Sequence, residues 1–171
     1  MSFGKSLKSV RERKELSQSN VANDLFVNQT MISKIEKGQR NMSDDLARAS
    51  SSLYDDAQYG FEVAREISKD YITPLVTAEK AVELHRLALE EVFKREATEA
   101  INKFNEVSLV KPPQYVDDTE KEQIAQGIGE LLDVQAVMNS FLMRLEQEYG
   151  ISIKACMRQR TPKWKAMGWI E

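Results

Sequence analysis

The sequence contains few of the residues that mark several classes of protein. Its 171 residues include one cysteine, four prolines and seven glycines. A single cysteine, Cys156, excludes an internal disulfide framework and fits a reducing compartment. So few glycines and prolines argue against a collagen-like, low-complexity or turn-rich all-β chain. No apolar run approaches 18 residues and none follows Met1, so we expect a cytoplasmic protein without a membrane span or signal peptide.

Charged residues are plentiful, but the two signs are unevenly distributed. The formal net charge is −3. Residues 1–41 hold eight Lys and Arg against four acidic residues, a balance of +4, and the remainder holds 16 against 23, a balance of −7. This change of sign suggests a nucleic-acid-binding module at the basic end, although an ordinary solvated surface would give the same balance.

The hydrophobic pattern predicts an all-α protein. Apolar residues recur at three- and four-residue spacing, and no stretch longer than a few residues alternates like a strand. Ser17, Ser43 and Thr119 are typical residues for helix starts. The pair Thr73-Pro74 combines a good N-cap with a proline at the first helical position.

A double proline at 112–113 indicates a connector between two long helices. We place a domain boundary near residues 68–74, which separates an N-terminal domain (1–70) from a helical extension (71–171). The extension is expected to contain helices over about 74–105 and 119–149, a connector over 106–118 and a basic tail over 151–171.

The N-terminal segment fits three short helices, over about 3–14, from Ser17 to the mid-twenties, and over about 29–37, where Gly38 ends the third. The third helix places apolar side chains on one face, namely Met31, Ile32 and Ile35. Its opposite face is polar and carries Gln29, Thr30, Ser33, Lys34 and Lys37. Reading base edges in a major groove requires polar side chains of this length on an exposed helix that follows a short turn. A merely solvated helix face is the alternative.

The stretch from Leu7 through Leu53 resembles the helix-turn-helix domain of the Xre-like DNA-binding family, the phage Cro/repressor type. The strongest matches are Leu16-Ser17-Gln18, Ala22, and "ISKIEKGQRN" from Ile32 to Asn41. The resemblance covers residues 3–67 and does not extend to the helical extension. It implies a five-helix, lambda-repressor-like domain.

The resemblance also implies roles for individual residues. Those expected to face base edges are Gln29, Thr30, Ser33 and Lys34. Those expected to bind the phosphate backbone are Gln18, Asn28, Lys37, Gln39, Arg40 and Asn41. Arg11 and Glu36 occupy the positions of a structural ion pair that ties the first helix to the third.

One residue departs from the family pattern. The family usually has glycine in the turn between the second and third helices, because that residue adopts a positive φ. Phe26 occupies this position here, at a cost on the order of 1 kcal/mol or more. We therefore expect either a rebuilt turn or a strained residue.

The extension contains a heptad pattern. Thr119-x-x-Glu122 matches a capping box and Gly150 is suited to end the helix. A seam with alternating spacings of four and three runs through Ile124, Ile128, Leu131, Gln135, Met138, Leu142, Leu145 and Tyr149. A second apolar set, Val134, Val137 and Phe141, widens this face.

The seam is open to two interpretations: a dimerisation or effector module, or a helical bundle within one chain. The preceding helix carries a comparable stripe, which would form a hairpin with the seam helix. Dimerisation is favoured because a two-fold dimer doubles the contacts of one small domain with a palindromic site. Gln135 would fix the register of the seam or lie at the edge of a bundle.

The tail combines five cations with Trp164 and Trp169, and Thr161-Pro162 suggests a short final helix. It would contact nucleic acid or a protein, or its tryptophans would pack against the body of the protein.

His85 is expected to be a packed histidine, because no second ligand lies at helical spacing. Cys156 lacks a CxxC partner. We expect no metal, no cofactor and no enzymatic activity.

The sequence therefore predicts a sequence-specific regulator of transcription that binds double-stranded DNA. We expect a homodimeric repressor of bacterial or phage/prophage type on a palindromic operator. The alternative is a protein-interaction adaptor, such as an anti-repressor or antitoxin-like regulator, whose extension binds a protein partner. The sequence names neither the operator nor the regulated genes.

Overall fold

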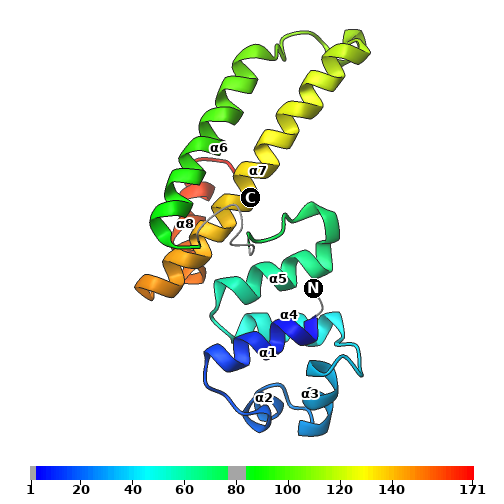
Figure 1. The fold of residues 1–171 in the computed structure, drawn as a ribbon, viewed down its shortest axis with the longest axis vertical. Helices are drawn as coiled ribbons and strands as arrows, with labels where there is room; N and C mark the ends of the chain where they lie inside the picture. Colours follow the sequence, from blue (N-terminus) through cyan, green and yellow to red (C-terminus); the bar gives the residue numbers. More distant parts are fainter. Residues whose placement is uncertain (1–2, 77–83) are drawn as a thin grey trace. The chain divides into compact units, whose positions relative to one another are not determined.

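A computed structural model describes residues 3–76 and 84–171. Within these ranges the chain forms eight α-helices and no strand, which confirms the predicted all-α class. The chain divides into two compact units, one of Met1–Pro74 with Glu146–Glu171 and one of Leu75–Leu145 (Figure 1). None of the described helices is long and apolar enough to cross a membrane.

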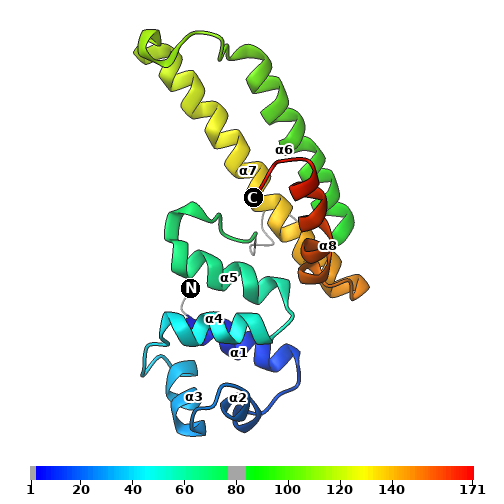
Figure 2. The same cartoon turned by 180° about the vertical axis from the view of Figure 1, so that it is seen from behind.

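The first unit contains five short helices in its N-terminal part (Figures 1 and 2). They are α1 (Phe3–Arg13), α2 (Gln18–Asp24), α3 (Gln29–Glu36), α4 (Asp44–Leu53) and α5 (Ala57–Ser68), followed by a 3-10 turn at Lys69–Tyr71. Four of these helices are capped by a side chain that accepts a backbone N–H bond, from Ser17, Asn28, Ser43 and Asp56. Ser17 and Ser43 were expected as helix starts, and both are confirmed.

One hydrophobic core joins these five helices. Its buried members are Leu7, Val10, Val21, Ala22, Leu25, Ile32, Ile35, Met42, Ala47, Tyr54, Tyr59 and Val63. The Tyr59 hydroxyl lies 2.6 Å from the Ser50 hydroxyl, and burial raises the pKa of Tyr59 to about 12. At Gly4 in α1, a Cβ atom would stand 2.1 Å from the carbonyl oxygen of Ile35. Only glycine lets α1 pass this close to the end of α3.

The second unit contains a helical hairpin, in which α6 (Arg86–Glu106) packs with most of α7 (Asp118–Tyr149). The Phe93 and Phe141 rings lie 6.3 Å apart, and Gly127 packs against the Phe104 ring. A connector with a 3-10 turn at Pro113–Tyr115 joins the two helices. The chain therefore forms the predicted hairpin within itself.

The predicted helix start at Thr73-Pro74 is wrong, because residues 74–76 lie outside any helix. The Val76 N–H donates to the Ser140 hydroxyl at 2.8 Å, and this bond holds the segment extended against α7. The helix α6 begins at Arg86, where Nδ1 of the exposed His85 accepts from the Ala88 N–H at 3.3 Å. His85 is therefore a cap and not the packed residue we expected. The rest of the predicted start, residues 77–83, lies outside the described residues.

The start of α7 also differs from prediction, whereas its end agrees. The capping box of α7 joins Asp117 to Glu120, each accepting the other's backbone N–H at 2.9 Å, and it replaces the predicted Thr119–Glu122 box. Lys111 supports it with a 2.7 Å bond to Glu120. At the other end, Gly150 has a φ of +66° and ends α7 as predicted.

The tail forms one longer helix, α8 (Ile153–Ala166), which encloses Pro162. The predicted helix start at Thr161-Pro162 is therefore wrong, because Ser152 caps the helix one residue before Ile153. The Thr161 hydroxyl donates to the Met157 carbonyl at 2.9 Å, which supports the backbone next to the proline.

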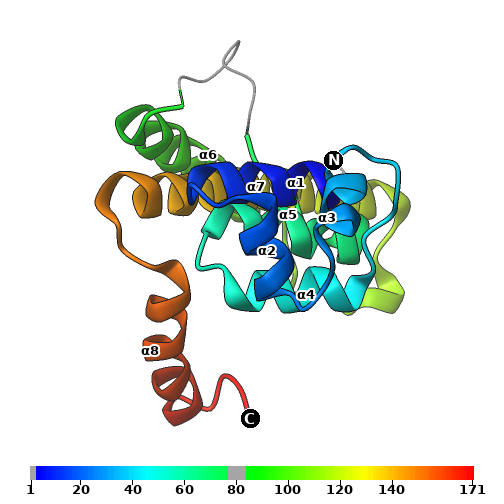
Figure 3. The same cartoon turned by 90° about the horizontal axis from the view of Figure 1, so that it is seen from below.

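Contacts near the start of α8 place the tail in the first unit, whereas the sequence grouped it with the extension. The Lys154 ammonium donates to the carbonyl oxygens of Ser51 and Ser52 at the end of α4. Figure 3 shows α8, in orange to red, extending away from α1–α5. Trp169 is 68% exposed, so it does not pack against the body of this unit.

Candidate nucleic-acid interface

A short turn places α3 after α2. Phe26, within this turn, has a φ of +54°, so the chain keeps the left-handed turn and accepts the strain. The Val27 N–H closes the turn by donating to the Ala22 carbonyl at 2.9 Å. The Asn28 side chain then caps α3 by accepting from the Met31 N–H at 2.7 Å. The bond back to α2 and the cap at Asn28 together fix where α3 begins.

Two opposite faces of α3 have different environments. Ile32 and Ile35 are buried in the core, and Met31 is partly buried against it. The side chains of the other face are exposed, except that Ser33 is half-buried; these residues are Gln29, Thr30, Ser33, Lys34 and Lys37. The division into faces is the one that the sequence predicts.

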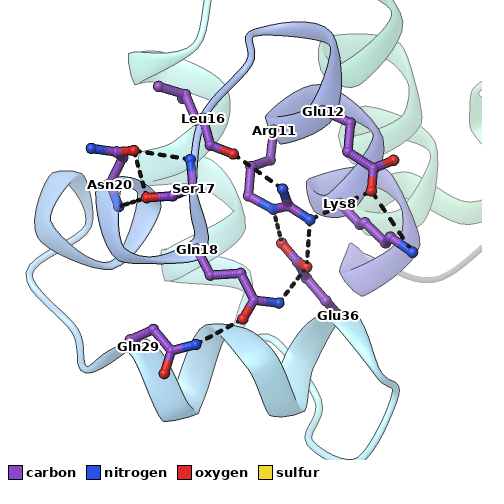
Figure 4. Close-up of polar contacts among 9 residues, drawn as sticks. All are labelled: Lys8, Arg11, Glu12, Leu16, Ser17, Gln18, Asn20, Gln29 and Glu36. Atoms are coloured by element: carbon purple, nitrogen blue, oxygen red, sulfur yellow. Dashed lines mark hydrogen bonds and ion pairs between the residues drawn. The ribbon is translucent and has the colours of Figure 1, made fainter.

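A chain of polar contacts holds α1, α2 and α3 together (Figure 4). The Arg11 guanidinium donates to both carboxylate oxygens of Glu36, at 2.6 and 3.0 Å. The Gln18 amide donates to the same carboxylate at 2.8 Å, and the Gln29 amide donates to the Gln18 carbonyl oxygen at 2.8 Å. The Arg11 guanidinium also donates to the Leu16 carbonyl at 3.1 Å. The first residue of α3 is thus linked through α2 to the ion pair.

The ion pair between Arg11 and Glu36 is shielded from water. The Glu36 side chain is 3% exposed and the Arg11 side chain is 14% exposed. The hydrogen bond to Glu36 raises the pKa of Arg11. Two parallel bonds between guanidinium and carboxylate fix orientation as well as distance. The pair that the resemblance implied is therefore present, and it fixes the position of α3 on α1.

The contacts of Gln29 determine what its amide is able to bind. One N–H of the amide is used by Gln18. The other N–H and the carbonyl oxygen are the pair of groups that matches the N6 and N7 edge of adenine in the major groove. Gln29 is exposed at the start of α3, where the helix N-terminus also favours an anion.

The residues predicted to follow the phosphate backbone lie at the end of α3. Gly38 has a φ of +71°, and the N–H groups of Gln39 and Arg40 both donate to the Lys34 carbonyl, at 2.8 and 3.2 Å. The side chains of this group are exposed, namely Lys37, Gln39, Arg40 and Asn41. Gln18 and Asn28 lie at the start of α2 and at the cap of α3, so both ends of α3 are flanked by predicted phosphate ligands.

Sequence reasoning missed two parts of this unit. Asn20 completes a capping box with Ser17, a pair whose three-residue spacing is visible in the sequence. Arg13 donates to both carboxylate oxygens of Asp56, at 2.9 and 2.8 Å, and Asp56 also caps α5. No local pattern joins residues 13 and 56, so only the fold reveals this pair.

The seam residues of α7 form a partly exposed stripe. Ile128 is 51% exposed, Leu131 50% and Met138 39%. Four others are half-buried, namely Ile124, Gln135, Leu142 and Leu145. Tyr149, at the end of the pattern, is 57% exposed. The buried residues of α7 instead include Gly127, Val137 and Met143.

One group of acidic side chains in the described residues is compact enough to hold a metal. Oxygen atoms of Glu96, Glu130 and Asp133 lie within 4.8 Å of one another in the second unit. The Arg95 guanidinium donates to Glu96 at 2.6 Å and neutralises part of this charge. The group contains no nitrogen or sulfur ligand and lies on α6 and α7 of the second unit.

Phe26→Gly is expected to raise the free energy of unfolding by about 0.5–1 kcal/mol, because glycine adopts a positive φ without the Cβ clash. Phe26→Ala is the matched control. It retains the clash and removes a ring that is 96% exposed, so its effect should stay below about 0.5 kcal/mol. Urea unfolding measures both variants. A glycine variant no more stable than the alanine variant would contradict a strained turn.

No protein-family model, curated protein or solved structure matches this chain.

Proposed function

We propose that the chain is a sequence-specific regulator of transcription that binds double-stranded DNA through a lambda-repressor-like helix-turn-helix domain. The observation that carries this proposal is the exposed polar face of α3, which follows a short turn and is fixed in place by the contacts from Arg11 to Gln29. A rigid helix with exposed amide, hydroxyl and ammonium groups suits the width and chemistry of a major groove.

In this proposal α3 enters the major groove. Base edges are read by Gln29, Thr30, Ser33 and Lys34. The phosphates on either side are bound by Gln18, Asn28, Lys37, Gln39, Arg40 and Asn41. The excess of four positive charges in residues 1–41 supports the same surface, because neutralising phosphates supplies much of the affinity for DNA.

The proposed regulatory role follows from the binding of the domain to its operator. A small domain that holds an operator through one helix acts most simply by blocking a promoter, so we propose a repressor of bacterial or phage type. All residues of the proposed interface lie between Gln18 and Asn41, within the first unit.

Arg40→Ala is expected to weaken binding to all DNA sequences and to lower the slope of log K against log salt by about 0.9, the share of one phosphate contact. Arg95→Ala is the matched control, because Arg95 is an exposed arginine of α6 outside the proposed interface. Fluorescence anisotropy with a labelled duplex over a range of salt concentrations measures both. An unchanged slope for Arg40→Ala would remove Arg40 from the interface.

A further inference from the structure

An open groove lies between α5 and the first two turns of α8, within the first unit. Its volume is about 410 Å³, which falls in the range of roughly 300–1,000 Å³ typical of small-molecule sites. Its lining is mainly apolar and includes a few charged side chains. This combination is the usual composition of a site that binds a small organic molecule.

The α5 wall of the groove is a second apolar face of that helix. The first face carries Tyr59 and Val63, which are buried in the core. The second face is only half-buried and consists of Ala57, Gly60, Phe61 and Ala64. All of these residues except Phe61 are glycine or alanine, so they leave space on this side of the helix. The face from Ala57 to Ala64 is roughly 10 Å long at about 1.5 Å per residue.

Gly60 keeps the middle of this face open. Glycine inside a helix lowers stability relative to alanine, and the usual reasons for its presence do not apply here. Gly60 does not have a positive φ, and a Cβ atom added to it would meet no heavy atom of the described residues within 4 Å. At Gly4, by contrast, a Cβ atom would collide with the backbone of Ile35. The missing side chain of Gly60 therefore relieves no contact within the protein, but it leaves room for a ligand.

The α8 wall is held in place by bonds at its start. One oxygen of the Glu146 carboxylate accepts from the Ala57 N–H at the start of α5. The other oxygen accepts from the Ile153 N–H at the start of α8, at 2.8 Å. The Lys154 ammonium binds the end of α4. The groove is therefore preformed, and Met157, which is 52% exposed, lines it with a flexible side chain that adapts to a ligand.

Arg158 is the cation of the groove that is available to a ligand. It lies one turn after Lys154 on α8 and is exposed. Its guanidinium has no hydrogen bond or ion pair with any other residue in the ranges 3–76 and 84–171. The Lys154 ammonium, by contrast, is already bonded to the end of α4. A guanidinium binds a carboxylate through two parallel N–H bonds, so Arg158 is suited to a ligand with a carboxylate group.

The acidic side chains of the groove limit the charge of the ligand. They are Asp55, Asp56 and Glu146. Asp56 accepts two bonds from Arg13, and Glu146 accepts from two backbone N–H groups, so both already have donors. The three carboxylates still repel additional negative charge. A head group with a single negative charge therefore fits the groove better than a phosphate monoester.

We propose that this groove binds a small carboxylic acid with an unbranched apolar chain, whose carboxylate pairs with Arg158 and whose acyl chain lies along α5. The acyl chain would cover apolar surface of Gly60 and Phe61 that is now open to water, which favours binding. The length of the α5 face suits a medium-chain acid such as octanoate. The groove includes no residue of α3, so this site does not depend on the proposed DNA-binding role.

Isothermal titration calorimetry of the full chain with sodium octanoate tests the carboxylate contact. The unmodified protein is expected to bind octanoate, and Arg158→Gln is expected to weaken binding about 10-fold, as for the loss of hydrogen bonds to a charged group. The matched control is Arg160→Gln, which changes an exposed arginine of α8 outside the groove. It should bind octanoate as the unmodified protein does. 1-Octanol has the same chain without the charge, so Arg158→Gln should not change its binding.

Gly60→Leu tests the apolar part of the groove. The leucine side chain would enter open space, so circular dichroism should show unchanged helices, whereas octanoate binding should be lost. The matched control is Gly129→Leu, the same change at a glycine of α7 where an added Cβ also meets no described atom within 4 Å. This variant should bind octanoate as the unmodified protein does.

Several results would overturn the proposal. They are the absence of octanoate binding by the unmodified protein, binding that survives Gly60→Leu, and equal effects of Arg158→Gln and Arg160→Gln. Sedimentation equilibrium without octanoate tests another occupant. A mass that changes with Gly60→Leu would assign the groove to a second copy of the chain and would also overturn the proposal. None of these measurements uses DNA, so failure of this site and failure of the DNA-binding role are told apart.

Discussion

Arg11→Ala is expected to lower the free energy of unfolding of the first unit by about 3–5 kcal/mol, the usual loss when one member of a buried ion pair is removed. The substitution leaves the Glu36 carboxylate, which is 3% exposed, with the Gln18 amide as its remaining side-chain donor. A domain of this size has about 5–15 kcal/mol of stability in total, so the loss is a large share. Urea or thermal unfolding followed by circular dichroism measures it.

The matched control for Arg11→Ala is Lys8→Ala in the same helix. Lys8 pairs with Glu12 at 3.8 Å, and both side chains are more than half exposed. A surface pair of this kind contributes about 0–1 kcal/mol, so this variant should be nearly as stable as the original. Equal effects of the two substitutions would show that the Arg11–Glu36 pair does not hold α1 and α3 together.

Gln29→Ala is expected to reduce discrimination at one base pair of the operator by about 1–3 kcal/mol, the value of one good amide–base contact. That loss corresponds to roughly a 5- to 150-fold change in the preference for the correct base. Affinity for unrelated DNA should change little, because the substitution removes no charge. Competition binding between the operator and its single-base variants measures the effect.

The control for Gln29→Ala is Gln159→Ala, which changes an exposed glutamine of α8 in the same unit. This substitution should leave base preference unchanged. A Gln29 variant that keeps full discrimination at all positions of the operator would remove Gln29 from the base-reading face, and α3 would then need a different orientation in the groove.

Local signals in the sequence were sufficient where a helix start depends on neighbouring residues. Ser17 and Ser43 cap helices because their hydroxyls reach N–H groups three residues on. Phe26 keeps a positive φ because the Val27 bond to Ala22 and the Asn28 cap enforce the turn. The two faces of α3 follow from its 3.6-residue period.

Prediction failed where distant contacts decide between local alternatives. Thr73-Pro74 suits a helix start, yet a bond from Val76 to Ser140, 64 residues away, holds the next residues extended. Pro162 suggested a helix start, yet Ser152 begins the helix earlier and the proline is enclosed. The link from Arg13 to Asp56 is likewise absent from any local pattern.

The heptad seam was visible in the sequence, but its partner was not. Spacing alone does not decide between α6 of the same chain and α7 of another, since both present apolar faces. In the structure α6 packs against α7, where Gly127 contacts the Phe104 ring, and the buried residues of α7 include Val137 and Met143. Ile128, Leu131 and Met138 of the seam stay partly exposed.

Selection of bound sequences from a random pool of duplex DNA tests whether the protein recognises a specific DNA sequence through α3. We expect the unmodified protein to enrich one palindromic sequence, and the Gln29→Ala variant to lose preference at one symmetric pair of positions in it. Failure of the unmodified protein to enrich any sequence above background would contradict sequence-specific DNA binding through α3, and it would favour a protein-interaction adaptor instead.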